Sequence, residues 1–165
     1  MKKKSNPATE LSNFLCKLLN TAGLHGITKW EAPWHPQGTR DSVDVAGSDG
    51  SGLRMLIEVE RLRENPVSNV VKVWQWLSGG SVPKDVVLIH AFSKSFEESK
   101  APRKERASFV GLRMIREFPT ASYLQLPLNV SPKSGAKGIG GASKDHVKEL
   151  VEEIRKVWKD HSKKA

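Results

Sequence analysis

The chain has 165 residues, a length typical of one domain, and its 38% hydrophobic and 27% charged residues are ordinary for a soluble globular protein. No apolar run approaches the roughly 20 residues of a membrane span, and no apolar signal segment follows the basic start MKKKSNPATE. The lone Cys16 builds no disulfide framework. We therefore expect a cytoplasmic protein. The net charge of +9 favours a polyanionic partner such as DNA, although many lysines lie in terminal runs that are commonly solvated tails.

Hydrophobic spacing and turn residues predict helices that alternate with strands. In chain order, the predicted elements are a helix through Leu11 and Leu19 that stops at Gly23, strands at 26–31, 41–47 and 53–60, a helix at 65–80, a strand at 85–93, a helix at 103–118, a strand at 121–128 and a helix at 144–161. The Asp49-Gly50 pair predicts a hairpin, so the second and third strands should be antiparallel neighbours. We expect a single α/β domain with a mixed sheet flanked by helices.

Two carboxylates end the third predicted strand. Glu58 and Glu60 are two residues apart, so they should lie on one face of the strand, and the hairpin can bring Asp44 across from them. Three such groups repel one another unless a cation holds them, and hard oxygen ligands suit Mg²⁺ or Mn²⁺. The pattern therefore predicts a divalent metal site, with Asp41 as a rival to Asp44. The competing interpretation is a solvated strand end whose carboxylates pair with neighbouring arginines.

Asp44, followed fourteen positions later by Glu58-Val59-Glu60 and set between a leading and a following helix, resembles the PD-(D/E)XK nuclease superfamily. The resemblance covers an αβββαβ core of the restriction-endonuclease-like fold at about 9–92, and leaves about 93–161 as a C-terminal α/β addition. It implies that Asp44 and Glu58 bind Mg²⁺ or Mn²⁺ and that the reaction is hydrolysis of DNA phosphodiester bonds.

The third position of the triplet departs from the family pattern, because Glu60 stands where lysine is usual. Some restriction endonucleases of this fold have glutamate there, so Glu60 is expected as a base or an additional metal ligand. In other members the lysine has moved to the next helix, and Lys72 is the candidate here, with a plain surface lysine as the alternative. Glu10 is in the position of a helical glutamate that some members use, and Arg40 is similar to an arginine of archaeal Holliday-junction resolvases.

Two basic segments are further candidates for nucleic-acid contact. KAPRKER contains Arg103 and Lys104 ahead of a helix and resembles a phosphate-contacting surface. SPKSGAKGIGGAS contains Lys137, and its backbone amides, which precede a helix, could hold a phosphate. A solvated helix start and a flexible connection are the respective alternatives.

These observations predict a metal-dependent DNA endonuclease of restriction or repair character, with RNA as a further substrate to consider. A homodimer is one expected assembly, because dimers are common where two strands must be cut. Two alternatives stay open: a nuclease-like domain that binds DNA without cutting it, and a protein of this fold whose basic surface serves a protein partner. Metal binding separates the nuclease from both alternatives, and salt-dependent DNA affinity separates the two alternatives from each other.

Overall fold

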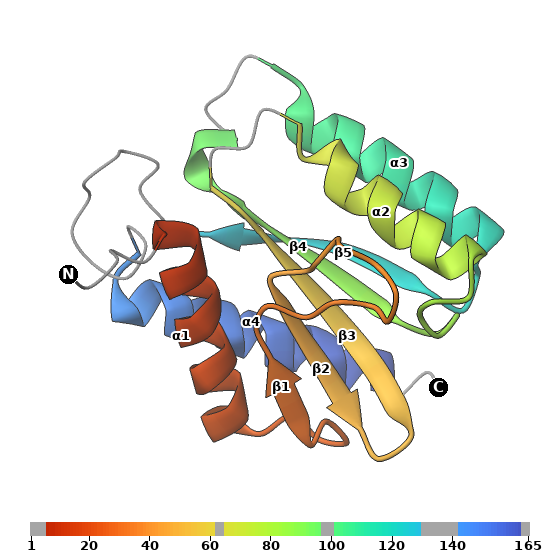
Figure 1. Ribbon diagram of the computed structural model, residues 1–165. Coiled ribbons are helices and arrows are strands. Elements are labelled where there is room, and N and C mark those ends of the chain that lie inside the picture. Colours follow the sequence, from red (N-terminus) through yellow and green to blue (C-terminus); the bar gives the residue numbers. More distant parts are fainter. Residues whose placement is uncertain (1–5, 62–64, 97–100, 130–141, 163–165) are drawn as a thin grey trace.

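A five-stranded sheet forms the centre of the computed structural model, which describes residues 6–61, 65–96, 101–129 and 142–162 (Figure 1). The elements are α1 Pro7–Ala22, β1 Lys29–Glu31, β2 Val45–Asp49, β3 Gly52–Glu60, α2 Val67–Ser78, β4 Val87–Ser93, the 3-10 helix η1 Lys94–Phe96, α3 Arg103–Glu117, β5 Ser122–Leu128 and α4 Lys144–Ser162. The predicted order of helices and strands is confirmed, as is an α/β class with a mixed sheet flanked by helices. The short helix η1 was not predicted.

The strands lie in the sheet in the order β1-β2-β3-β4-β5. β1, β2 and β3 are antiparallel neighbours, whereas β3, β4 and β5 are parallel. Asp49 closes the predicted hairpin between β2 and β3, since its Oδ1 accepts the backbone N–H groups of Ser51 at 2.7 Å and Gly52 at 3.0 Å. This turn brings the start of β2 to the end of β3, where the two glutamates lie.

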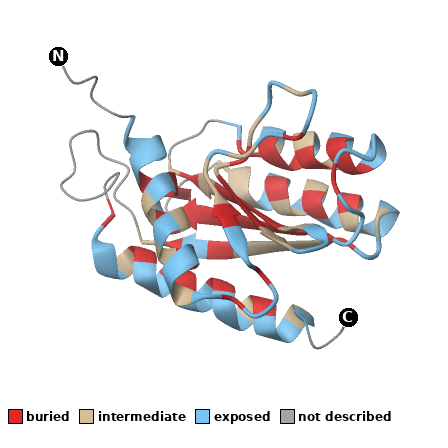
Figure 2. Ribbon diagram, turned by 60° about the horizontal axis from the view of Figure 1, so that its bottom comes forward, coloured by how far each residue is buried: buried red, intermediate tan, exposed pale blue. Residues whose placement is uncertain are grey.

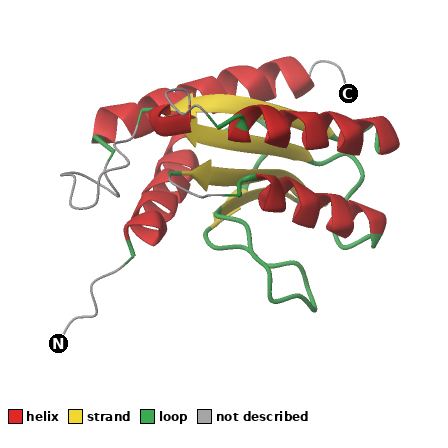
Figure 3. Ribbon diagram, turned by 90° about the horizontal axis from the view of Figure 1, so that it is seen from above, coloured by secondary structure: helices red, strands yellow, loops and turns green. Residues whose placement is uncertain are grey.

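Two strands are shorter than predicted. β1 begins at Lys29, and β2 begins at Val45 rather than at residue 41. Ahead of β2, Val43 pairs instead with Trp34 in an isolated bridge, with N–H to carbonyl distances of 2.9 and 3.1 Å. The long connection between β1 and β2 is drawn as a green loop in Figure 3. Asp44 consequently lies just outside the β2 ladder, where its side chain can turn toward β3.

The sheet separates two hydrophobic cores. One core packs α1 and α4 against the face that includes Ile57, and the other packs α2 and α3 against the face that includes Leu56. Figure 1 shows α2 and α3 side by side, away from α1 and α4. Every residue of β4 is buried, which confirms the expectation that 85–93 contains a strand covered on both faces. Figure 2 shows the same arrangement, with buried strands at the centre and exposed outer helix surfaces.

Helix α1 has well-defined ends, and its first turn lies near the start of β2 and the end of β3, where Ala8 borders the same pocket as Asp44 and Glu58. The Asn6 side chain accepts the N–H of Ala8 at 3.0 Å, Pro7 occupies the first turn, and Gly23 ends the helix at a φ of 63°. Within the described ranges, the helices lack the combination of length and apolar character that a membrane span requires.

Candidate functional site

Three carboxylates and one lysine line a single pocket at the end of β3. The pocket has a volume of about 290 Å³, and its lining includes Asp44, Glu58, Glu60 and Lys72. The antiparallel register of β2 and β3 brings Asp44 beside Glu58, and the helix after β3 supplies Lys72. The residues predicted for the site thus come together from the start of β2, the end of β3 and the middle of α2.

Asp44 is oriented by the backbone of β3. Its Oδ2 accepts the N–H of Val59 at 2.8 Å, just beyond the last paired residues of β2 and β3. Burial raises the pKa of the Asp44 carboxyl, because the charged form loses solvation. The hydrogen bond from Val59 and the positive charge of Lys72 act in the opposite direction. Asp44 is therefore a fixed acidic group whose charged form gains from a nearby cation.

Glu58 and Lys72 form a largely buried ion pair. Glu58 Oε1 lies 2.6 Å from Lys72 Nζ, and the exposed fractions of the two side chains are 4% and 16%. The same Nζ donates a hydrogen bond to the carbonyl oxygen of Ser42. Burial, followed by repulsion from Asp44, raises the pKa of Glu58 to about 8, and Lys72 offsets only part of this increase. Two carboxylates thus share one lysine in a poorly solvated pocket.

Glu60 has different partners. It is 2% exposed, and its Oε1 accepts hydrogen bonds from Asn69 Nδ2 at 2.5 Å and from His90 Nε2 at 2.9 Å. Asn69 belongs to the first turn of α2, and His90 lies on β4, the parallel neighbour of β3. Glu60 therefore connects the end of β3 to both following elements, rather than joining the pair formed by Glu58 and Lys72.

The hydrogen bonds continue from His90 to the edge strand β5. His90 is fully buried, and its Nδ1 lies 3.1 Å from the hydroxyl of Tyr123. That hydroxyl accepts a hydrogen bond from Nε2 of Gln125 at 2.9 Å, and the same Nε2 donates to the backbone carbonyl of Lys104 at 3.0 Å. The two ring nitrogens of His90 thus link Glu60 on β3 to the Tyr123 hydroxyl on β5.

Asn69, His90 and Tyr123 were not predicted as site residues. One signal in the sequence was available, because His90 is a polar residue within the apolar run of β4. Its hydrogen bond to Glu60 could not be read from the sequence, because it depends on the parallel register of β3 and β4, two strands that a whole helix separates along the chain.

The acidic groups offer oxygen ligands for a metal, but they do not form a closed cage. In the described part of the chain, no three His, Cys, Asp or Glu side chains converge closely enough to hold an ion. Asp44 and Glu58 remain a suitable pair for Mg²⁺ or Mn²⁺, because both are hard oxygen donors, burial raises the pKa of each, and Lys72 is the lysine that lowers both values. Glu60 fits less well, because its Oε1 already accepts two hydrogen bonds.

The remaining predicted residues lie at different distances from this pocket. Arg40 lines an adjoining groove, and Glu10 is an exposed residue in the first turn of α1, the turn whose Ala8 lines the pocket itself. Arg103 and Lys104 are half-buried at the start of α3. Lys137 lies outside the described residues, so its predicted contact with nucleic acid stays a prediction.

Neither the models of known protein families nor the curated proteins include a match to this chain. The residues and geometry of the pocket are therefore the basis for assigning a function.

Proposed function

We propose that the protein is a metal-dependent endonuclease that hydrolyses phosphodiester bonds in DNA. The observation that carries this proposal is the convergence of Asp44, Glu58 and Lys72 in one pocket, with Glu58 and Lys72 in contact at 2.6 Å. The order from α1 through β4, with three antiparallel strands followed by a parallel one, supports the restriction-endonuclease-like core that the sequence pattern predicts.

Asp44 and Glu58 would hold the divalent cation, because both border the pocket and Lys72 neutralises only one of their two charges. When bound, Mg²⁺ or Mn²⁺ supplies an activated water and stabilises negative charge on the reacting phosphate. The hydrogen bond from Val59 keeps the Asp44 carboxylate in a fixed orientation. A pre-oriented acidic pair of this kind loses little freedom when it binds an ion.

Lys72 supplies positive charge to the pocket, beside Glu58. Its ammonium reaches both Glu58 and the Ser42 carbonyl, so it is held between α2 and the segment before β2. From this position it donates to a non-bridging phosphate oxygen and stabilises the charge that builds up in the transition state. Glu60 is assigned a supporting role, because its hydrogen bond to Asn69 fixes the first turn of the helix that carries Lys72.

The proposal is tested by incubating the purified protein with supercoiled, linear and four-way-junction DNA, and with RNA, in Mg²⁺, Mn²⁺ or EDTA. We expect metal-dependent cleavage that falls roughly 100-fold or more in Asp44→Asn, Glu58→Gln and Lys72→Met, because each variant removes a charge that acts on the transition state. The matched controls are Asp145→Asn and Lys148→Met, which remove an exposed ion pair of 3.0 Å on α4. Both should cleave at the wild-type rate.

Two results would overturn the proposal. One is the absence of metal-dependent cleavage of every substrate by correctly folded protein. The other is cleavage that survives unchanged in Asp44→Asn and Glu58→Gln, because the activity would then come from elsewhere. DNA binding without cleavage would instead favour the alternative of a nuclease-like domain that binds nucleic acid only.

A further inference from the structure

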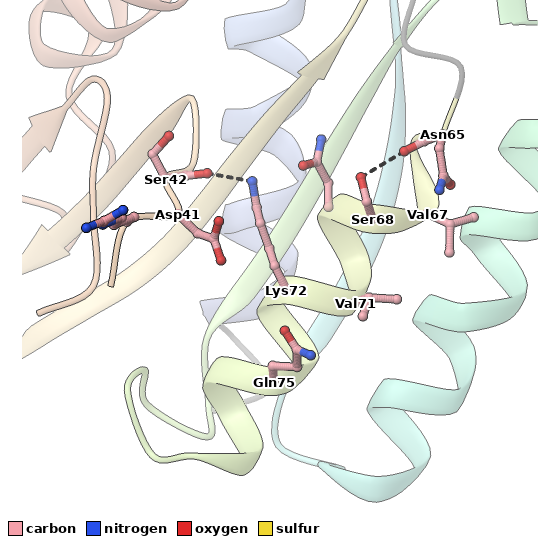
Figure 4. Close-up of a pocket in the computed structure, with 10 residues that line it drawn as sticks. Asp41, Ser42, Asn65, Val67, Ser68, Val71, Lys72 and Gln75 are labelled. Atoms are coloured by element: carbon pink, nitrogen blue, oxygen red, sulfur yellow. Dashed lines mark hydrogen bonds between the residues drawn. The ribbon is translucent and has the colours of Figure 1, made fainter. Parts of the chain in front are cut away.

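A second and larger groove opens beside the candidate site. Its volume is about 550 Å³, and it lies between the exposed face of α2 and the segment at residues 40–42. Ser42, Asn69 and Lys72 line both this groove and the smaller pocket, so the two spaces adjoin. Figure 4 shows Lys72 extending from α2 to Ser42, and these two residues line both spaces. A chain molecule whose reacting group lies in the pocket can therefore continue into the groove.

The wall opposite α2 is held in place by several contacts. Trp34 packs edge-on against Trp76 of α2 with ring centroids 6.3 Å apart, and it pairs through its backbone with Val43. Farther along the wall, the carbonyl oxygen of Asp41 lies 3.1 Å from Nδ1 of His35. The groove is thus formed before any ligand arrives, which lowers the entropic cost of binding.

The lining of the groove combines a cation, apolar groups and polar side chains. Arg40 is exposed and, within the described ranges, has no ion-pair partner. Val71 is 37% exposed, and the exposed Ser68 and Gln75 lie on the same helix (Figure 4). An unpaired guanidinium suits a phosphate, while the apolar and polar groups suit a sugar and a base. Among the described residues of the lining, Asp41 is the one acidic side chain, and it repels a phosphate at the end of the groove where it lies.

We propose that this groove binds the nucleic-acid strand next to the scissile phosphate, with Arg40 contacting a neighbouring phosphate on one side only. The inference rests on the proposed nuclease function, and it adds a defined path for the substrate strand. The strand reaches the Asp44–Glu58 pair past Lys72 and follows the exposed face of α2 toward Gln75. The groove contributes binding, and the pocket contributes the chemistry.

The test measures binding of fluorescently labelled DNA in EDTA, and then KM and kcat in Mg²⁺, for the full chain and its variants. Arg40→Ala and Gln75→Glu should each weaken binding roughly tenfold and raise KM, with kcat within about twofold of wild type. The salt slope of binding should also fall by about one in Arg40→Ala. A series of DNAs, each with one phosphate replaced by a neutral methylphosphonate, locates the contact. The wild type should lose affinity when the replaced phosphate is the one that Arg40 contacts, on one side of the cleaved bond. Arg40→Ala should lose no affinity from that same replacement.

The controls make comparable changes on other surfaces: one removes an arginine and the other introduces a glutamate. Arg155→Ala removes an exposed arginine of α4, on the opposite face of the sheet, and Leu112→Glu adds a charge to the exposed face of α3. Both should bind DNA as the wild type does. If the wild type cleaves DNA and both Arg40→Ala and Gln75→Glu bind DNA as the wild type does, the proposed role of the groove is wrong and the proposed nuclease activity is not affected. If these variants lose binding but the wild type cleaves no substrate, the proposed nuclease activity is wrong and the groove is still a site of nucleic-acid binding. A wild type that binds no nucleic acid would overturn both.

Discussion

At the scale of single residues, the pocket is dominated by buried charge. Glu58 and Lys72 contact each other at 2.6 Å, and Asp44 adds a second negative charge with no lysine of its own. A buried pair of like charges is costly in the absence of a compensating cation. This arrangement lowers the stability of the folded protein, and under the proposed function a bound divalent ion would offset that cost.

The pH dependence of stability should reveal this cost. The pKa of Glu58 is raised to about 8 in the folded protein, above that of an unfolded glutamate, so the folded state binds more protons between about pH 4.5 and 8. The free energy of unfolding of the metal-free protein should therefore fall as pH rises through this window, by on the order of a few kcal/mol. Urea unfolding in EDTA at pH 5.5 and 8 measures the change.

Glu58→Gln is the control for that experiment, because glutamine does not titrate. Its stability should change much less between the two pH values. A wild-type protein that becomes more stable as pH rises from 5.5 to 8 would contradict the assignment of Glu58 as the buried carboxyl that controls this dependence.

Glu60 offers a second test at this scale. If it acts through hydrogen bonds to Asn69 and His90, Glu60→Gln should keep cleavage within about threefold, because the amide oxygen still accepts both donors. Glu60→Ala leaves those donors unpaired and should lower the free energy of unfolding by about 1–3 kcal/mol. Cleavage assays and urea unfolding give the two readouts. If Glu60→Gln lost as much activity as Glu58→Gln, Glu60 would instead be a metal ligand or a base.

At the scale of elements, the site depends on how α2 sits against β3. Asn69 and Lys72 are three residues apart, so they lie on one face of α2 and reach Glu60 and Glu58 respectively. Ser68, Val71 and Gln75 lie on the exposed side, which lines the groove. One helix thus serves both the pocket and the groove, through two adjacent faces.

The contact between α3 and β5 leads to a prediction about the stability of a Gly111 variant. A Cβ added to Gly111 of α3 would lie 2.1 Å from Cδ1 of Tyr123, a residue of the network around His90. Overpacking costs about 1–3 kcal/mol, and a distance of 2.1 Å places this case in the upper part of that range, at about 2–3 kcal/mol. Alanine gains about 1 kcal/mol in helix propensity over glycine. Gly111→Ala should therefore lower the free energy of unfolding by about 1–2 kcal/mol in urea titrations.

Leu112→Ala is the control for this prediction, because Leu112 lies on the same helix and is 52% exposed. Its stability should stay within about 0.5 kcal/mol of wild type. If Gly111→Ala proved as stable as the wild type or more so, the close approach of α3 to Tyr123 would not exist in solution.

At the scale of the whole molecule, the net charge of +9 should govern the strength of binding to nucleic acid. Lysine and arginine contacts to phosphates release counterions, so DNA affinity should fall at least tenfold between 50 and 200 mM salt. Fluorescence anisotropy with two DNAs of unrelated sequence measures the effect, which should be similar for both. Affinity that is independent of salt would mean that the excess charge of the chain takes no part in binding.

Much of the architecture followed from local patterns along the chain. Apolar residues at helical spacing, the apolar run of β4 and the turn at Asp49 predicted the order of the elements and the hairpin. These signals act over a few residues, so they can be read without knowing the fold. The hairpin also brought Asp44 to the end of β3, but the register shift between Gly47 and Ser48, which aligns Asp44 with Glu58 rather than with Ile57, could not be read from the sequence.

The tertiary structure alone decided which partners these acidic residues have. The sequence predicted that Glu58 and Glu60 share one face of the strand and one metal site, yet Glu58 pairs with Lys72 and Glu60 with His90. That difference depends on the packing of α2 against β3 and on the parallel register of β3 and β4, which join segments far apart in the chain. Burial, which raises the pKa of Glu58, is likewise a property of the packed molecule, because solvation is lost only when the surrounding elements assemble.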